Sequence, residues 1–442
     1  MAPARFQHHF KPSPASARPI LVHNALYNGV VDADSSVGRL DMQSIVIIGA
    51  GQAGIQTAES LRKAGFTGDL TLLDHNPNAV FQRPPLSKAF LAGEINEERL
   101  RLRPASFFDS PGIQSRLNVR VTRIDRPNQS VHLSDGSSVA YDRLVLATGA
   151  RPRPIEAYRF LGDRVHLIRD LSDAKRLRDR LSQIQSVAII GGGFLGLECA
   201  ATLQKLGKSV TVLEQQPRLL ARVSSPAIAD YLHQAHTSNG VRIYTNTTIS
   251  LVTLHPSNEG ESIRIALANS SPIDVDELVV AIGVLPNAEL AADCGLAVEG
   301  GIVTNADGQT ADPRIYAVGD VAAFHHSVYQ RTVRLESIDN AFEQARSLAQ
   351  HLLHQKPTVH KIPWFWSDQY QHKLLIAGLS THGAEWVLKG DPALNSFTVG
   401  AFVDNRLQSV ECLNQPKDFA KFRKALNNNE NISKTAFLED AI

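Results

Sequence analysis

Two copies of one short pattern constrain this chain more than any other feature. Each copy is a β-rich apolar run followed at once by Gly-x-Gly-x-x-Gly and then by a helical stretch. In such a motif the first glycine permits a tight turn, the second lets a pyrophosphate approach the backbone, and the third lets helix and strand pack closely. The chain therefore predicts an α/β fold with two Rossmann-like dinucleotide-binding domains. The motif glycines are Gly49, Gly51 and Gly54 in the first copy and Gly191, Gly193 and Gly196 in the second.

A carboxylate follows each motif at the spacing this domain requires. Asp74 lies 20 residues after Gly54, and Glu214 lies 18 residues after Gly196. A carboxylate at the end of the second strand accepts hydrogen bonds from the 2′-hydroxyl of an adenosine ribose. At Glu214 a 2′-phosphate would meet a like charge, so this residue predicts a preference for NADH over NADPH.

The two modules also share an exit strand that ends in small residues. The first such strand ends at Thr148-Gly149 and the second at Gly283. A third apolar strand ends in Gly-Asp at Asp320, where a carboxylate can accept hydrogen bonds from sugar or ribityl hydroxyls. Because Asp320 comes after the second module, the first domain must be completed by chain that returns later. Two dinucleotides in one chain suggest electron transfer between them.

The composition narrows the class of protein. Lys and Arg number 45 against 44 Asp and Glu, so the net charge of +1 gives no reason to expect nucleic acid or a membrane surface as partner. The chain contains no uninterrupted stretch of about 18 apolar residues, so no membrane-spanning helix is expected. The three cysteines, Cys199, Cys294 and Cys412, are far apart. They give no disulfide scaffold, no CxxC pair and no local zinc site, and they fit a protein of a reducing compartment, which predicts a cytoplasmic location. No metal is expected. We interpret the pair His325-His326 as exposed loop residues.

Residues 1–41 mix Pro, Ser, Ala, His and Arg without periodicity. We expect this stretch to be a disordered extension or the product of a mis-set start, with Met42 as the true first residue. A targeting peptide rich in Arg and poor in acidic residues is the alternative.

Four further motifs carry a resemblance over about residues 42–425. They are Arg-Pro-Pro-Leu-Ser-Lys ending at Lys88, Leu-Ala-Thr-Gly ending at Gly149, Ala-Val-Gly-Asp ending at Asp320, and Pro-Trp-Phe-Trp-Ser-Asp-Gln-Tyr ending at Tyr370. With them the chain resembles the NADH-dependent ferredoxin and rubredoxin reductases, a branch of the flavoprotein pyridine-nucleotide reductases. The resemblance implies an FAD-binding domain from residues 42–155 and 284–360, an NAD-binding domain from 156–283, and a small α+β interface domain from 361–442.

The resemblance also implies individual roles. Around FAD it places Gly49, Gly51, Ala53, Gly54, Lys88, Val121, Thr148, Gly149, Arg151, Asp320, Ile338 and Trp366, and around NAD it places Gly191, Gly193, Gly196, Glu198, Glu214 and Gly283. The chain departs from this branch at the end of the second strand. The branch usually has an acidic residue one or two positions after Asp74, where this chain has His75 and Asn76. Either Asp74 or His75 is therefore expected to bind the adenosine ribose of FAD. Lys88, Glu198 and Trp366 are the candidate catalytic residues. Glu198 is expected to face the nicotinamide and pair with Lys88, or else only to complement its helix dipole.

The two tryptophans of the last motif, Trp364 and Trp366, are expected on opposite faces of an extended run, one in the core and one over the flavin. The alternative is that both are structural. Disulfide-reducing relatives of this superfamily carry a close cysteine pair in the first domain, and none is present here. Electrons must then leave to an external acceptor.

The expected function is a reductase that takes a hydride from NADH and passes single electrons to a ferredoxin or rubredoxin serving an oxygenase or hydroxylase, as a monomer or weak homodimer. Two alternatives stay open, an NADH oxidase or small-molecule flavin reductase, and a signalling flavoprotein. The basic residues Lys417, Lys421, Arg423 and Lys424 lie on a predicted C-terminal helix. They are either a docking patch for an acidic carrier or a plain solvated face.

Overall fold

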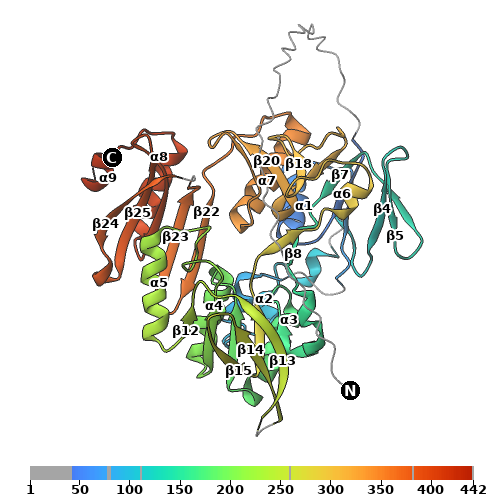
Figure 1. Ribbon diagram of the computed structural model, residues 1–442. Coiled ribbons are helices and arrows are strands. Elements are labelled where there is room, and N and C mark those ends of the chain that lie inside the picture. Colours follow the sequence, from blue (N-terminus) through green and yellow to red (C-terminus); the bar gives the residue numbers. More distant parts are fainter. Residues whose placement is uncertain (1–41, 77–80, 110–111, 258–259, 381–382, 441–442) are drawn as a thin grey trace, which may run out of the picture. The chain divides into compact units, whose positions relative to one another are not determined.

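A parallel sheet of five strands carries the first glycine motif (Figure 1). The computed structural model describes residues 42–76, 81–109, 112–257, 260–380 and 383–440. The strand order is β19-β7-β1-β2-β3, with every neighbouring pair parallel. A parallel sheet is covered on both faces, which explains why its strands read as continuous apolar runs. The strands are β1 (Ser44–Ile48), β2 (Asp69–Leu73), β3 (Gln114–Arg116), β7 (Arg143–Leu146) and β19 (Ile315–Ala317).

Helices cover one face of this sheet and an antiparallel sheet covers the other. Helix α1 (Gln52–Lys63) packs with α7 (Ile338–His354) over one apolar core. On the opposite face a second core lies under the strands β4 (Val121–Asp125), β5 (Ser130–Leu133) and β6 (Ser138–Ala140) and the short helix α6 (Glu289–Asp293).

The second glycine motif lies in a sheet built on the same plan. Its strand order is β12-β11-β10-β16-β9, again parallel. The strands are β9 (Val165–His166), β10 (Ser186–Ile190), β11 (Ser209–Leu213), β12 (Arg242–Tyr244) and β16 (Glu277–Val280). Helices α3 (Leu171–Arg180), α4 (Phe194–Lys205) and α5 (Pro226–Ser238) cover one face, and β13 (Ile249–Ser257), β14 (Gly260–Leu267) and β15 (Ser270–Val275) cover the other.

Two short antiparallel strands join the modules. Strand β8 (Ala150–Pro152) leaves the first sheet, and β17 (Val284–Pro286) returns beside it. The chain then forms β18 (Ile302–Thr304), β19, β20 (Ala322–His326) and β21 (Arg331–Val333). Because β19 pairs with β7, the first sheet is completed by chain that follows the second module. The exact domain limits stay a prediction.

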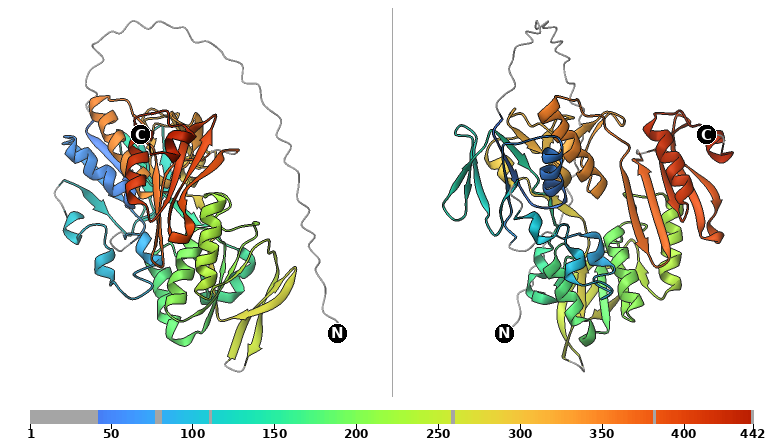
Figure 2. Two further views of the ribbon diagram at one scale, coloured as in Figure 1. Left: turned by 90° about the vertical axis from the view of Figure 1, so that its left-hand side faces the viewer. Right: turned by 180° about the vertical axis from the view of Figure 1, so that it is seen from behind.

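The C-terminal sheet is antiparallel and lies between two sets of helices. Its order is β22-β23-β26-β25-β24, with bounds β22 (Trp364–Gln369), β23 (His372–Gly378), β24 (Glu385–Asp391), β25 (Ser396–Val403) and β26 (Arg406–Leu413). Helices α8 (Pro416–Asn427) and α9 (Lys434–Leu438) pack on one face. The other face packs on the second module, with α5 running beside the strands in both views of Figure 2.

The interpretation of the pair His325-His326 as exposed loop residues is wrong in two respects, because both lie in strand β20 and His326 is buried. His326 ends strand β20 and is 2% exposed, because the alternation of that strand points it inward while His325 points to solvent. Its ring centroid lies 4.7 Å from that of His360 and 4.9 Å from that of Tyr329. His326 is thus a core residue.

Buried histidines predict that this protein loses stability in mild acid. Burial lowers the pKa of His326 and that of His236 to about 4 each. The stability that each contributes is complete above the unfolded-state pKa, near 6.5, and is lost as pH falls from there toward 4. The loss reaches about 3 kcal/mol per residue. We expect His326→Gln to flatten the fall in unfolding free energy between pH 6.5 and 4.5, measured by denaturant titration. His325→Gln is the matched control, and an equal slope in both variants would contradict the assignment.

Candidate functional site

One continuous cavity of about 1960 Å³ connects the two glycine motifs with strand β22. Every residue carried over from the resemblance lines it except Gly54 and Gly196, the third glycine of each motif. A Cβ atom on Gly54 would lie 1.8 Å from the Gly49 carbonyl oxygen, and one on Gly196 would lie 2.1 Å from that of Gly191. The third glycines therefore serve helix–strand packing, while the others face the cavity.

The middle glycines leave the space that a pyrophosphate needs. A Cβ atom on Gly193 would meet nothing within 4 Å, and one on Gly51 would meet only the guanidinium of Arg83 at 3.9 Å. Helices α1 and α4 begin here, and neither has an acidic residue in its first turn. Their N-terminal amides and positive dipole ends are thus open to an anion. Each module fits the phosphates of one dinucleotide.

The carboxylates at the two strand ends hold the glycine loops in the same way. Asp74 accepts hydrogen bonds from the amides of Ala50 (2.6 Å) and Asn76 (2.7 Å). Glu214 accepts them from the amides of Gly192 and Gln216, both at 2.7 Å. These carboxylates shape the loops besides lining the cavity. His75, the alternative to Asp74, also lines the cavity, with its side chain 65% exposed.

The expected ion pair between Lys88 and Glu198 is confirmed. Lys88 Nζ lies 3.1 Å from Glu198 Oε1, and the side chains are 20% and 9% exposed. The hydroxyls of Ser87 and Ser367 each donate to this carboxylate at 2.8 Å. Asp368 lies 3.8 Å from the ammonium on its other side. Glu198 is therefore held by three donors, two from the adjacent residues Ser87 and Lys88 and one from Ser367 on β22, well beyond what complementing the dipole of α4 requires.

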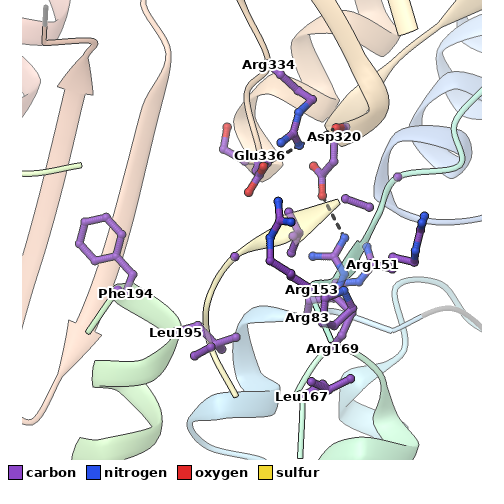
Figure 3. A pocket seen from close by; sticks show the side chains of 18 of the residues that line it. Arg83, Arg151, Arg153, Leu167, Arg169, Phe194, Leu195, Asp320, Arg334 and Glu336 are labelled. Carbon is purple, nitrogen blue, oxygen red and sulfur yellow. Dashed lines mark hydrogen bonds and ion pairs between the residues drawn. The ribbon is translucent and has the colours of Figure 1, made fainter. Parts of the chain in front are cut away.

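Arginines gather where the two modules meet (Figure 3). Arg169 donates to Asp320 at 3.0 Å, and Arg334 lies 2.6 Å from Glu336. The Nε atom of Arg169 is buried and has no partner within the described part of the chain. The pKa of Arg83 is lowered, first by desolvation and then by the charge of Arg169. This concentration of positive charge fits a pyrophosphate, and Asp320 within it remains available to hydroxyl groups.

Sequence reasoning put Arg151 at the flavin and missed Arg169. Arg151 lines the cavity but is half exposed, and it pairs with Glu289 at 2.7 Å and with Asn287 at 2.9 Å. Arg169 lies 151 residues before its partner Asp320, and no local motif marks it. Arg83 opens the motif that ends at Lys88, so the sequence carries a signal for it.

The expectation that Trp364 and Trp366 point to opposite faces is wrong. Residues two apart in a strand share a face, and the two ring centroids are 5.4 Å apart. Trp366 and Trp364 both line the cavity. The Arg423 guanidinium lies 5.1 Å from the Trp364 ring, and the Trp364 indole donates to Asp339 at 2.6 Å. The pair thus forms a short aromatic path from the cavity to helix α8.

The remaining predicted site residues lie along the cavity wall. The Thr148 hydroxyl donates to the Asn287 carbonyl at 2.7 Å, which ties the first exit strand to the returning chain.

Cys199 is fully buried, and burial raises the pKa of its thiol, as expected of a structural cysteine. No cysteine of the described residues lines the cavity, and these residues contain no cluster of three potential metal ligands. None of the described helices is long and apolar enough to cross a membrane.

Comparison with known proteins defines the class. Residues 43–345 match the family described as pyridine nucleotide-disulphide oxidoreductase, and residues 364–442 match the reductase C-terminal family. The chain belongs to the pyridine nucleotide-disulphide oxidoreductase family. It is an oxidoreductase whose cofactors are FAD and NAD.

Its relatives narrow the class further. The chain is 41% identical to rhodocoxin reductase of Rhodococcus erythropolis, over 87% of this chain and 89% of the relative. It is 38% identical to putidaredoxin reductase CamA of Pseudomonas putida, over 87% and 91%. Among solved structures, the reductase of a covalent putidaredoxin reductase–putidaredoxin complex superposes with a TM-score of 0.85 at 36% identity, covering 90% of this chain and 96% of that one.

Proposed function

We propose that this protein takes a hydride from NADH and delivers single electrons to a ferredoxin or rubredoxin that serves an oxygenase or hydroxylase. One observation carries the proposal: two dinucleotide cradles open into one cavity, with the Lys88–Glu198 pair inside it. When bound, FAD accepts the hydride and releases electrons one at a time. The cavity has no cysteine among its described lining residues, which favours an external acceptor.

The first module and the returning chain would hold FAD. Gly49, Gly51 and Ala53 form the phosphate cradle, and Asp74 shapes it. Arg83 and Arg169 would neutralise the pyrophosphate, and Arg151 stays a predicted contact of FAD. Val121, Thr148, Gly149, Asp320, Ile338 and Trp366 line the rest of this site.

The second module would hold NADH. Gly191, Gly193, Glu214 and Gly283 line its half of the cavity. Glu198 projects from the first turns of α4 toward the first module, and its carboxylate keeps Lys88 in place. As the resemblance implies, Lys88 would lie near the reactive face of bound FAD, where its ammonium would offer a positive charge as negative charge accumulates. A preorganised charge of this kind stabilises the reduced state without reorganisation.

The C-terminal sheet and helix α8 would meet the electron carrier. The aromatic path from Trp366 through Trp364 leads toward Arg423 on α8. Two of the four residues in the predicted basic patch are paired with carboxylates. Lys421 lies 3.2 Å from Asp440, and Arg423 lies 3.5 Å from Asp339. Lys417 and Lys424 are exposed and leave a modest positive field for an acidic partner.

Raising the salt concentration should slow carrier reduction about threefold while leaving NADH-to-ferricyanide activity unchanged, since exposed charges are screened. Joint replacement Lys417→Gln and Lys424→Gln should remove most of this salt dependence. The control is the same replacement at two exposed lysines elsewhere, Lys63→Gln and Lys356→Gln. The docking role is wrong if the two double variants respond alike to salt in steady-state carrier reduction.

The two alternative functions have less support. An NADH oxidase would benefit from a reactive cysteine at the flavin, and the described cavity lining has none. A signalling flavoprotein of this fold would carry a long C-terminal insertion, whereas residues 364–442 match the reductase C-terminal family. We propose a cytoplasmic location, because the chain's three cysteines are all unpaired, as in a reducing compartment. A monomer or weak homodimer stays a prediction.

The flavin content tests the proposal. Purified protein should be yellow, should release one FAD per chain on denaturation, and should lose its flavin absorbance when NADH is added without oxygen. Colourless protein that FAD cannot reconstitute would reject the function.

A further inference from the structure

Glu411 is a buried carboxylate that the proposed chemistry does not use. It lies on β26, a strand with a neighbour on each side, and is 2% exposed. Burial raises its pKa to about 7. A charge in the core of a sheet is costly unless it is hydrogen-bonded and paired, so its partners are informative.

Within the described residues, all hydrogen bonds of its carboxylate run to the start of helix α5 in the second module. The Ser225 amide donates to both carboxylate oxygens at 3.0 Å. The Ser225 hydroxyl donates at 2.5 Å and the Ser224 hydroxyl at 3.2 Å. Alternation along β26 explains the direction, because Val410 and Cys412 face the core under α8 while Leu413 packs toward the second module.

The chain segment just before Ser225 lies over the NAD glycine loop. The Leu220 amide donates to the Gly192 carbonyl at 3.0 Å, and Leu220 has a φ of +51°, an unfavourable value for leucine. Arg218 braces the segment by donating to the carbonyls of Leu219, Ala221 and Ser224. Leu220, Ala221, Arg222 and Val223 line the cavity, as does Glu411 itself.

We propose that Glu411 is a positioning residue through which the C-terminal sheet holds residues 217–225 against the NAD glycine loop. Within the segment, Leu220 is bonded to Gly192 of the glycine loop, and Ser225 at its end is bonded to Glu411. Releasing the second of these bonds lets the strained Leu220 turn relax away from the loop and the exposed Arg222 leave the cavity wall. The C-terminal sheet thus supports the NAD site at a second place, besides the hydrogen bond from Ser367 to Glu198. The inference rests on the proposed NAD site in the second module.

The test measures NADH binding by anaerobic calorimetry to the flavin-loaded protein, with its flavin first reduced by dithionite so that no hydride is transferred during the titration. KM and kcat are measured separately in ferricyanide reduction. Glu411→Gln keeps the shape but replaces an acceptor by an amide that faces the donors of Ser225. We expect its Kd and KM for NADH to rise about tenfold while kcat changes less than twofold and FAD content stays at one per chain. Glu411→Asp should recover part of the affinity.

The matched control is Glu277→Gln. Glu277 is a fully buried carboxylate of the second module, on β16. It accepts a hydrogen bond from Arg180 and pairs with His166, away from the cavity. The substitution should lower Tm without changing the Kd for NADH by more than twofold. Ser225→Ala decides the matter if Glu411→Gln does not fold, and it should raise Kd about threefold.

Two results would overturn the inference. If the parent binds NADH and the Glu411 and Ser225 variants bind it equally well, residues 217–225 need no support from the C-terminal sheet. If the parent holds FAD but binds no NADH at all, the proposed function fails, and this inference fails with it.

Discussion

Replacing Lys88 by methionine should slow the bleaching of the flavin by NADH at least about 100-fold, the size of loss found when one preorganised charge-stabilising donor is removed. Lys88 lies at the cavity with its ammonium 3.1 Å from Glu198. Its removal also leaves a nearly buried carboxylate without a counter-ion, which costs stability as well as rate. Stopped-flow absorbance under NADH without oxygen measures the rate.

Two variants separate the charge of Lys88 from its bulk. Lys88→Arg keeps a cation and should recover at least a tenth of the rate. Lys205→Met removes an exposed lysine from the far end of α4, whose ammonium lies 3.4 Å from the Tyr370 carbonyl oxygen, and should change the rate less than twofold. Bleaching of the Lys88→Met protein within threefold of the parent would show that this charge does not assist reduction.

Glu214→Gln should shift the ratio of kcat/KM for NADH over that for NADPH by at least about 30-fold toward NADPH. Like charges about 4 Å apart in a partly buried site repel by about 4 kcal/mol at an effective dielectric near 20, and the substitution removes that repulsion. Arg218 is not free to bind a 2′-phosphate, because three backbone carbonyls occupy it. Arg222 lines the same cavity and is exposed, so it is the cation placed to receive the phosphate.

Glutamine is preferred to a smaller residue for a structural reason. Glu214 accepts hydrogen bonds from the amides of Gly192 and Gln216, so its truncation would also loosen the glycine loop. Glu214→Ala should therefore weaken both cofactors strongly. Glu214→Gln keeps one of the two acceptor oxygens, so it loses one of these amide hydrogen bonds, weakens both cofactors less, and has its main effect on the ratio. A parent that already prefers NADPH, or a ratio that does not move in Glu214→Gln, would show that another residue selects the cofactor.

Local spacing was enough to predict the parts of the fold that repeat. Both glycine motifs, both strand-end carboxylates and the late return to the first sheet follow from distances along the chain. The Lys88–Glu198 pair came from the resemblance, since 110 residues separate its members. Each of these features depends on short-range backbone geometry or on a motif that can be read directly.

The errors arose where side-chain direction or tertiary contact decides the outcome. The two tryptophans share a face because the strand repeats every two residues, a rule that was applied wrongly. His326 is buried because β20 alternates, and its neighbour His325 carries the exposed position. The partner of Arg169, Asp320, is 151 residues away along the chain, and the partner of Glu411, Ser225, is 186 residues away. No local sequence pattern therefore indicates either contact.

The measurement that tests the central claim most directly compares electron acceptors. NADH-driven reduction by the purified flavin-loaded protein would be followed with a [2Fe–2S] ferredoxin, with rubredoxin and with oxygen, each at the same concentration. The account predicts that one of the two iron proteins is reduced at least about 100-fold faster than oxygen is consumed. Oxygen consumption as fast as the reduction of both iron proteins would contradict it and favour an oxidase.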